Sequence, residues 1–346
     1  MSSLRSFFTV NKCQSPALGA AVWLPVFLAA ALAAGVLSIC LGAVGIGPAQ
    51  LLEVLLGKAD PLSPAYRIVM HVRLPRTAAA LLAGAALAVS GAIIQAVLNN
   101  VLASPNIIGV NSGAGLFALL GMAFLPARPA LVPVAAFLGA FLTAMLVYAV
   151  AMKTGASRIT IVLTGMAVGS ILSAGINAIT VLRPEAVVGA YSFMMGGLSG
   201  VTASGLRFAS GYILAGVAAA LALSHEMNVL TLGEDMAATL GMQVKAMRFL
   251  LIAVAALLAG AAVSFAGLLG FVGLLVPHGV RMLVGGDNRV LIPACALCGA
   301  GFVTLCDLLS RLLFAPYELP VGIFMSFLGG PFFLYLLLKQ RRKINA

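Results

Sequence analysis

The sequence predicts an all-α, polytopic membrane protein with about ten transmembrane helices. Hydrophobic residues fill 62% of the 346 positions and charged residues only 8%, whereas about a quarter of the residues in a typical soluble domain are charged. Apolar runs long enough to cross a bilayer recur along the chain, from 22–44 through to 321–338. Charged or Pro/Gly-rich breaks separate these runs, as expected of connections between spans.

These breaks set the positions of the expected helices. The spans are expected to begin near residues 21, 76, 108, 130, 159, 207, 249, 268, 289 and 320. The first run follows Arg5 and Lys12 and resembles a signal peptide, but it continues well beyond residues 29–31, so we interpret it as a retained span. The run from Leu268 to Val284 has the least regular pattern, because glycines and Pro277 interrupt it.

The basic residues predict the orientation of the chain. Lys and Arg concentrate in cytoplasmic loops of membrane proteins, and pairs at 153/158 and 245/248 and a cluster at 339–343 fall at turns on one predicted side. Both termini are therefore expected in the cytoplasm. The same bias explains much of the net charge of +11, which in a soluble chain would indicate nucleic-acid binding.

An internal repeat is also indicated. The segment 80–86 recurs as 256–262, and in the expected topology the two copies run in opposite directions, as in transporters with inverted repeats. We expect one transmembrane permease domain over 1–346.

Two segments do not fit the pattern of span and short turn. The external connection 183–207 has room for a short helix from Ala186 to Met195 that could cap a pathway. The cytoplasmic segment 232–248 predicts a short helix with Glu234 and Asp235 in its first turn and Gly241 at its end. That helix is either a plain connector or a knob that docks into a motor protein.

Three arginines lie on the outer face, against the inside bias: Arg73, Arg76 and Arg311. The spacing favours local pairing, since Asp307 lies four residues before Arg311. The alternative is a basic rim that steers an acidic partner.

The spans hold few groups that could perform chemistry. Asp307 and His278 are the main ionisable residues, which disfavours proton-coupled transport; a structural role for His278 is favoured over haem ligation. No P-loop is present. The pair Cys295 and Cys298 lacks further zinc ligands. Polar residues that could line a path or hydrogen-bond between helices are Gln95, Asn111, Ser112, Asn177 and Thr180.

Motifs along nearly the whole chain resemble a known family, the iron-siderophore, haem and cobalamin permeases of binding-protein-dependent ABC importers. The matching segments are 73–76 (RLPR), 84–95, 100–105 (NVLASP), 108–115 (IGVNSGAG), 194–197 (MMGG), 232–241 (LGEDMAATLG), 271–278 (FVGLLVPH) and 318–322 (ELPVG). The chain departs from the family at Ser104, where an aspartate is usual, at Asn288, where a histidine is common, and at Phe193, where a tryptophan often precedes the glycines.

The resemblance implies the partners and the site residues. It implies ten spans, a second permease copy or a paralogue, two ATPase subunits that bind ATP and Mg²⁺, and a periplasmic or lipid-anchored binding protein, with no cofactor in this chain. Arg73, Arg76 and Arg311 would face acids on the binding protein. The residues of the ATPase-coupling helix would be Gly233, Glu234, Asp235, Ala237, Leu240 and Gly241. The cytoplasmic gate would comprise Asn100, Leu102, Ala156 and Ser157.

The expected function is ATP-driven import of a metal chelate across the inner membrane by alternating access, with no bond chemistry in this chain. A ferric siderophore is the leading expectation, followed by cobalamin and haem. An ion-coupled secondary transporter and a membrane enzyme are the rival classes.

Overall fold

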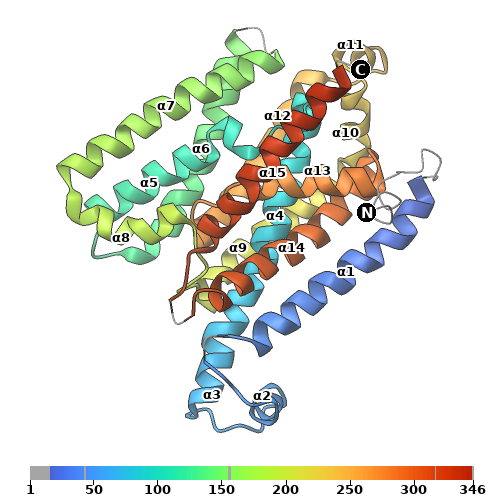
Figure 1. The fold of residues 1–346 in the computed structure, drawn as a ribbon. Helices are drawn as coiled ribbons and strands as arrows, with labels where there is room; N and C mark the ends of the chain where they lie inside the picture. The colour runs from blue at the N-terminus through green and yellow to red at the C-terminus, as the bar shows by residue number, and fades with distance from the viewer. Residues whose placement is uncertain (1–15, 43, 155–156, 316, 345–346) are drawn as a thin grey trace.

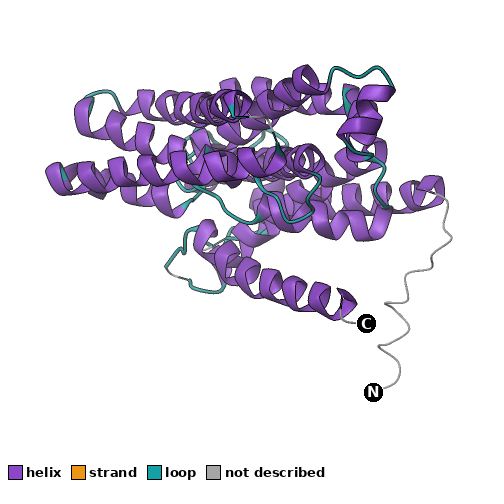
Figure 2. Cartoon of the chain, turned by 90° about the horizontal axis from the view of Figure 1, so that it is seen from above, coloured by secondary structure: helices purple, strands orange, loops and turns teal. Residues whose placement is uncertain are grey.

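A computed structural model describes residues 16–42, 44–154, 157–315 and 317–344. Within these residues the chain consists of helices and loops without strands, which confirms the all-α prediction (Figures 1 and 2). Ala156, one of the predicted gate residues, lies outside the described residues.

Ten helices occupy the ten predicted positions. They are α1 (Pro16–Cys40), α4 (Leu74–Leu98), α5 (Val110–Phe124), α6 (Val132–Lys153), α7 (Arg158–Leu182), α9 (Ala203–Ala222), α12 (Val244–Ala266), α13 (Val272–Val284), α14 (Asn288–Leu312) and α15 (Val321–Ile344). Seven helical segments among the described residues are long and apolar enough to cross a membrane. The helices α5 and α13 and the apolar part of α15, Val321–Leu334, are shorter, so a count of ten full spans is not confirmed.

Shorter helices fill the connections. They are α2 (Pro48–Leu55), α3 (Pro64–Arg67), α8 (Pro184–Met195), α10 (Ser224–Thr231), α11 (Glu234–Thr239), a π-helix at Ile68–Arg73 and 3₁₀ turns at Pro105–Ile108 and Pro129–Leu131. The helix α8 confirms the one expected at 186–195. The structure also extends the second span: it forms part of a helical stretch over Pro64–Leu98 rather than starting near residue 76.

The predicted span from Leu268 to Val284 is not confirmed as a full crossing. The helix α13 begins only at Val272 and has 13 residues, and at 1.5 Å rise per residue it reaches about two thirds of a hydrocarbon core. The chain before it is not helical, because Gly267 (φ 69°) and Phe271 (φ 64°) have left-handed backbone conformations. The Leu268 N–H donates instead to the Phe193 carbonyl, at the end of α8 (2.9 Å).

The helix α4 forms the centre of the bundle. In the most apolar 18-residue part of the stretch Pro64–Leu98, 83% of the residues are buried, whereas in the corresponding part of α7 the share is 11%. Small residues let neighbouring helices approach closely: a Cβ built on Gly91 would lie 1.9 Å from the Gly273 carbonyl oxygen of α13. The repeated segments lie on α4 and α12, which the Ser90 hydroxyl joins by donating to the Ala255 carbonyl (2.7 Å).

The two ends of the bundle carry different short elements. In Figure 1, α2 and α3 extend from the lower end, whereas α10 and α11 lie at the upper end. The candidate functional residues fall at these two ends and along α7.

Candidate functional site

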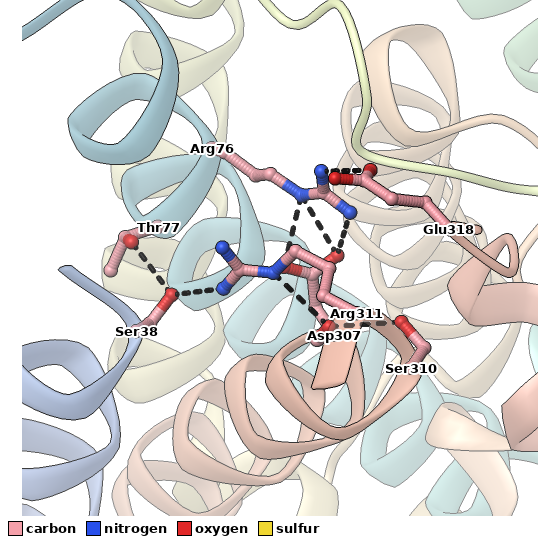
Figure 3. Close-up of polar contacts among 7 residues, drawn as sticks. All are labelled: Ser38, Arg76, Thr77, Asp307, Ser310, Arg311 and Glu318. Atoms are coloured by element: carbon pink, nitrogen blue, oxygen red, sulfur yellow. Dashed lines mark hydrogen bonds and ion pairs between the residues drawn. The ribbon is translucent and has the colours of Figure 1, made fainter. Parts of the chain in front are cut away.

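A buried ion network occupies the lower end of the bundle (Figure 3). Asp307 of α14 has no exposed surface, and its carboxylate accepts hydrogen bonds from Arg76 of α4, from Nε (3.1 Å) and Nη2 (3.0 Å). The Arg76 Nη1 donates to Glu318 (2.7 Å), in the loop before α15. Arg76 therefore joins α4 to α14 and to the loop after α14, 231 and 242 positions away in the sequence.

Arg311 completes this network. Its Nε lies 3.2 Å from the second carboxylate oxygen of Asp307, and its Nη2 donates to the hydroxyl of Ser38 on α1 (2.8 Å). The Ser38 and Thr77 hydroxyls are 2.8 Å apart and hydrogen-bonded. Two guanidinium groups and two carboxylates thus balance their charges, as a buried ion network must to offset desolvation.

Arg73 donates hydrogen bonds to the end of α1 and to the chain that follows it. Its guanidinium donates to the carbonyls of Ile39 and Cys40 (both 2.9 Å) and to that of Val44. A cationic donor that satisfies several carbonyls fixes the course of a loop. Arg73 therefore fixes the end of α1 and the segment that leads to α2.

The three arginines do not form an exposed basic rim in this structure. Arg73, Arg76 and Arg311 are only 3%, 6% and 4% exposed, because each has hydrogen-bond partners within the chain. The ion pair expected between Asp307 and Arg311 is confirmed. Contact of these arginines with a binding protein stays a prediction.

The predicted coupling segment, 232–248, forms the expected helix. Glu234 and Asp235 occupy the first turn of α11, and after Leu240 the N–H of Gly241 (φ 84°) donates to Ala238 and that of Met242 donates to Ala237 (both 3.0 Å). These two bonds form a Schellman motif, and the helix ends at Gly241 as predicted. Ala237 is buried, whereas Leu240 is 63% exposed, so the helix presents an apolar side chain outward.

Three of the predicted gate residues, Asn100, Leu102 and Ser157, lie in two turns. The Asn100 side chain accepts a hydrogen bond from the Leu102 N–H (2.9 Å) and so stiffens the loop after α4. The Ser157 hydroxyl caps α7 by accepting from the Thr160 N–H (3.1 Å).

A polar groove of about 510 Å³ runs along α7. Among its lining residues are Asn106, Ser112, Ser170, Ser173 and Asn177, so two of the five expected path residues face it. Gln95 instead accepts a hydrogen bond from Arg281 of α13 (2.7 Å), and Thr180 donates to the Ile176 carbonyl (2.9 Å). Cys295 is fully buried on α14, which agrees with a packing role.

A polar cluster that no sequence pattern predicts joins α10 to the start of α14. The Asn228 amide donates to Asp287 (2.7 Å) and accepts from the Asn288 N–H (2.8 Å). Hydrogen bonds from Asn228 and from the Arg289 N–H lower the pKa of the Asp287 carboxyl. The Arg289 guanidinium contacts His225 Nδ1 (2.8 Å). Pairs about 60 positions apart follow no helical spacing.

Known proteins share this fold and sequence. A solved ABC transporter of metal-chelate type, in an inward-facing conformation, superposes with a TM-score of 0.79 at 28% identity, covering 91% of this chain and 98% of that one. A cobalamin import permease of Halobacterium salinarum is 42% identical over 81% of this chain and 75% of its own length. An Fe(3+)-citrate import permease of Bacillus subtilis is 37% identical, over 89% and 92%.

A hemin transport permease of Yersinia pestis is 35% identical over 88% of this chain and 93% of its own length. The model of the FecCD transport family matches residues 30–339. This match covers, in whole or in part, all ten of the helices that occupy the predicted span positions. The chain is therefore a multi-pass membrane protein that belongs to the FecCD transport family.

Proposed function

We propose that this chain is the permease subunit of an ATP-driven importer that moves a metal chelate across the bacterial inner membrane by alternating access. The observation that carries the proposal is the family match over residues 30–339. The chain acts in transport and is not an enzyme. ATP and Mg²⁺ bind to separate ATPase subunits, since the sequence contains no P-loop.

The coupling segment 232–248 is the proposed contact with the ATPases. Leu232, Met236 and Leu240 are 61%, 56% and 63% exposed, although α11 is too short to span a bilayer. Exposed apolar side chains on a short helix suit a groove in a partner protein. The coupling residues Gly233, Glu234, Asp235, Ala237, Leu240 and Gly241 all belong to this helix or its caps.

The polar groove on α7 is the proposed lining of the translocation path. Serine and asparagine side chains are unfavourable against lipid, so the α7 face that carries Ser170, Ser173 and Asn177 requires a polar neighbour. A second permease copy or a paralogue would cover it and enclose a path. The predicted gate residues Asn100, Leu102, Ala156 and Ser157 would then gate its cytoplasmic end.

The opposite end is the proposed docking face for the binding protein. Arg73, Arg76 and Arg311 support that face from within, because their contacts fix the chain after α1 and the loop with Glu318. The external connection 183–207 borders a cavity of about 520 Å³, lined in part by Glu185, Ser192 and Thr202. The whole chain forms one permease domain with both termini in the cytoplasm, in line with its basic clusters.

An ion-coupled secondary transporter is the less favoured alternative. Asp307 is the one acidic residue within the long helices, and two arginines hold its carboxylate. With no exposed surface, this carboxylate does not face the water-filled path that a coupled ion would need. The structure therefore favours an external energy source.

The test is transport by the reconstituted complex. In vesicles that contain the permease, its ATPase and its binding protein, uptake is expected to require ATP and to fall to background without nucleotide. The chelate that most stimulates ATP hydrolysis identifies the substrate; we expect a ferric siderophore, with cobalamin and haem as alternatives. Uptake driven by an ion gradient in the absence of ATPase would contradict the proposal.

A further inference from the structure

Glu234 is the point at which three helices meet at the upper end of the bundle. It is the first residue of α11, and its Oε1 accepts a hydrogen bond from Nη2 of Arg248 on α12 (2.5 Å). The same oxygen lies 3.8 Å from Nε of Arg158, the first residue of α7. One carboxylate thus lies between the coupling helix, the helix that follows it and the helix that carries the polar groove.

The two arginine contacts are unequal. The contact with Arg248 is a hydrogen bond, whereas 3.8 Å to Arg158 is too long for one. The Arg158 Nε is buried and has no hydrogen-bond acceptor among the described residues. A buried donor without an acceptor is unfavourable, so a small movement of Glu234 toward α7 would give this group its missing partner.

The connections of α11 permit such a movement. Gly233 (φ 113°) and Gly241 (φ 84°) flank the helix in conformations that favour glycine. A Cβ built on either glycine would meet no atom within 4 Å, so neither glycine is packed in place. Short glycine-flanked helices are suited to hinge motion.

Arg158 is well placed to receive a force and pass it to α7. Its backbone belongs to the first turn of α7, which the Ser157 hydroxyl caps through the Thr160 N–H. Because a helix moves as a stiff rod, displacement of its first turn also moves the groove residues farther along α7.

We propose that Glu234 is a positioning residue that transmits displacement of α11 to α7 through Arg158, closing the 3.8 Å contact into a hydrogen bond when the ATPases move α11. This inference rests on the proposed function and adds an internal link to it. The proposed contact with the ATPases gives Glu234 a role at the surface of the permease. The link to Arg158 gives it a second role, inside the permease.

The link affects coupling far more than stability. The Glu234 side chain is 43% exposed, and pairs open to water contribute little to folding. The Glu234→Gln variant keeps an acceptor for Arg248 and removes the charge that attracts Arg158. The Arg158→Gln variant removes the guanidinium on α7 that faces Glu234, and it leaves the hydrogen bond between Glu234 and Arg248 in place.

The experiment measures chelate imported per ATP hydrolysed in vesicles that contain the complete importer. Both Glu234→Gln and Arg158→Gln are expected to lower this ratio about tenfold, while ATP hydrolysis changes by less than about twofold. The double variant should be no worse than either single variant, because both remove the same link. Lys153→Gln is the matched control for Arg158→Gln, since Lys153 is exposed at the end of α6, just before α7, and has no ion-pair partner among the described residues; its ratio should not change.

Other outcomes would overturn the inference. An unchanged ratio in Arg158→Gln shows that the link carries no motion, and an equal loss in Lys153→Gln assigns the effect to the general positive charge at this end of the bundle. Additive losses in the double variant show independent roles. If wild-type vesicles show no ATP-driven uptake, the proposed function itself fails, which is a distinct result.

Discussion

Asp307→Ala is expected to destabilise the folded permease by about 3–5 kcal/mol, because it leaves two buried guanidinium groups without their shared carboxylate. Arg76 would retain Glu318, and among the described residues Arg311 would retain only the Ser38 hydroxyl and the main-chain carbonyl of residue 307 as acceptors. The loss should appear as a lower midpoint of thermal unfolding and as less folded protein in detergent extracts.

Glu318→Gln provides the control for this prediction. Glu318 contacts the same Arg76, but its side chain is 40% exposed, and a pair open to water is worth roughly 0–1 kcal/mol. The variant should unfold close to the wild-type temperature. Equal losses in the two variants would show that burial of Asp307 does not determine the strength of the network.

The ion network contains one contact that the sequence could predict and one that it could not. The pair of Asp307 with Arg311 could be predicted, because a separation of four residues places both side chains on one helix face. The pair of Arg76 with Asp307 spans 231 positions and depends on how α4 and α14 pack. The sequence could therefore indicate that Arg76 was significant, but it could not show that its charge is neutralised inside the bundle.

The positions of the helices were largely predictable, because the bilayer requires long apolar segments and Lys/Arg-rich turns mark their ends. The lengths of the helices were less predictable. The start of α13 depends on Gly267, whose backbone packs against the Phe193 carbonyl, and this contact with α8 leaves no local signal. The π-helix at Ile68–Arg73 was missed for a similar reason, since nothing in its composition distinguishes it from an α-helix.

The helix α11, the proposed coupling helix, was predictable because its determinants are local. Acids in the first turn and Gly241 past the last one define it without help from the rest of the chain. The contact of Glu234 with Arg158 is different, because the two residues are 76 positions apart and belong to separate helices. Local sequence signals therefore predicted α11, whereas its contact with Arg158 could be found only from the fold.

Gly84→Ala is expected to disrupt the packing of α4 against α14. A Cβ on Gly84 would lie 2.1 Å from the Gly299 carbonyl oxygen and 2.6 Å from its carbon. These are backbone atoms in the middle of a helix, so they cannot rotate away as a side chain could. Overpacking of this kind costs about 1–3 kcal/mol, and more where the backbone must move. Thermal unfolding of the purified permease would measure the loss.

Gly211→Ala is the matched control, since it makes the same change in a helix where a Cβ would meet no atom within 4 Å. Alanine favours helix over glycine by up to about 1 kcal/mol, so this variant should equal or exceed the wild type in stability. Gly299→Ala tests the same crossing from the other side, where the new Cβ would lie 2.4 Å from the Gly84 carbonyl oxygen. If Gly84→Ala and Gly299→Ala unfold at the wild-type temperature, the two helices are farther apart than the structure places them. If Gly211→Ala is as damaging as Gly84→Ala, close helix approach is not the cause of the loss.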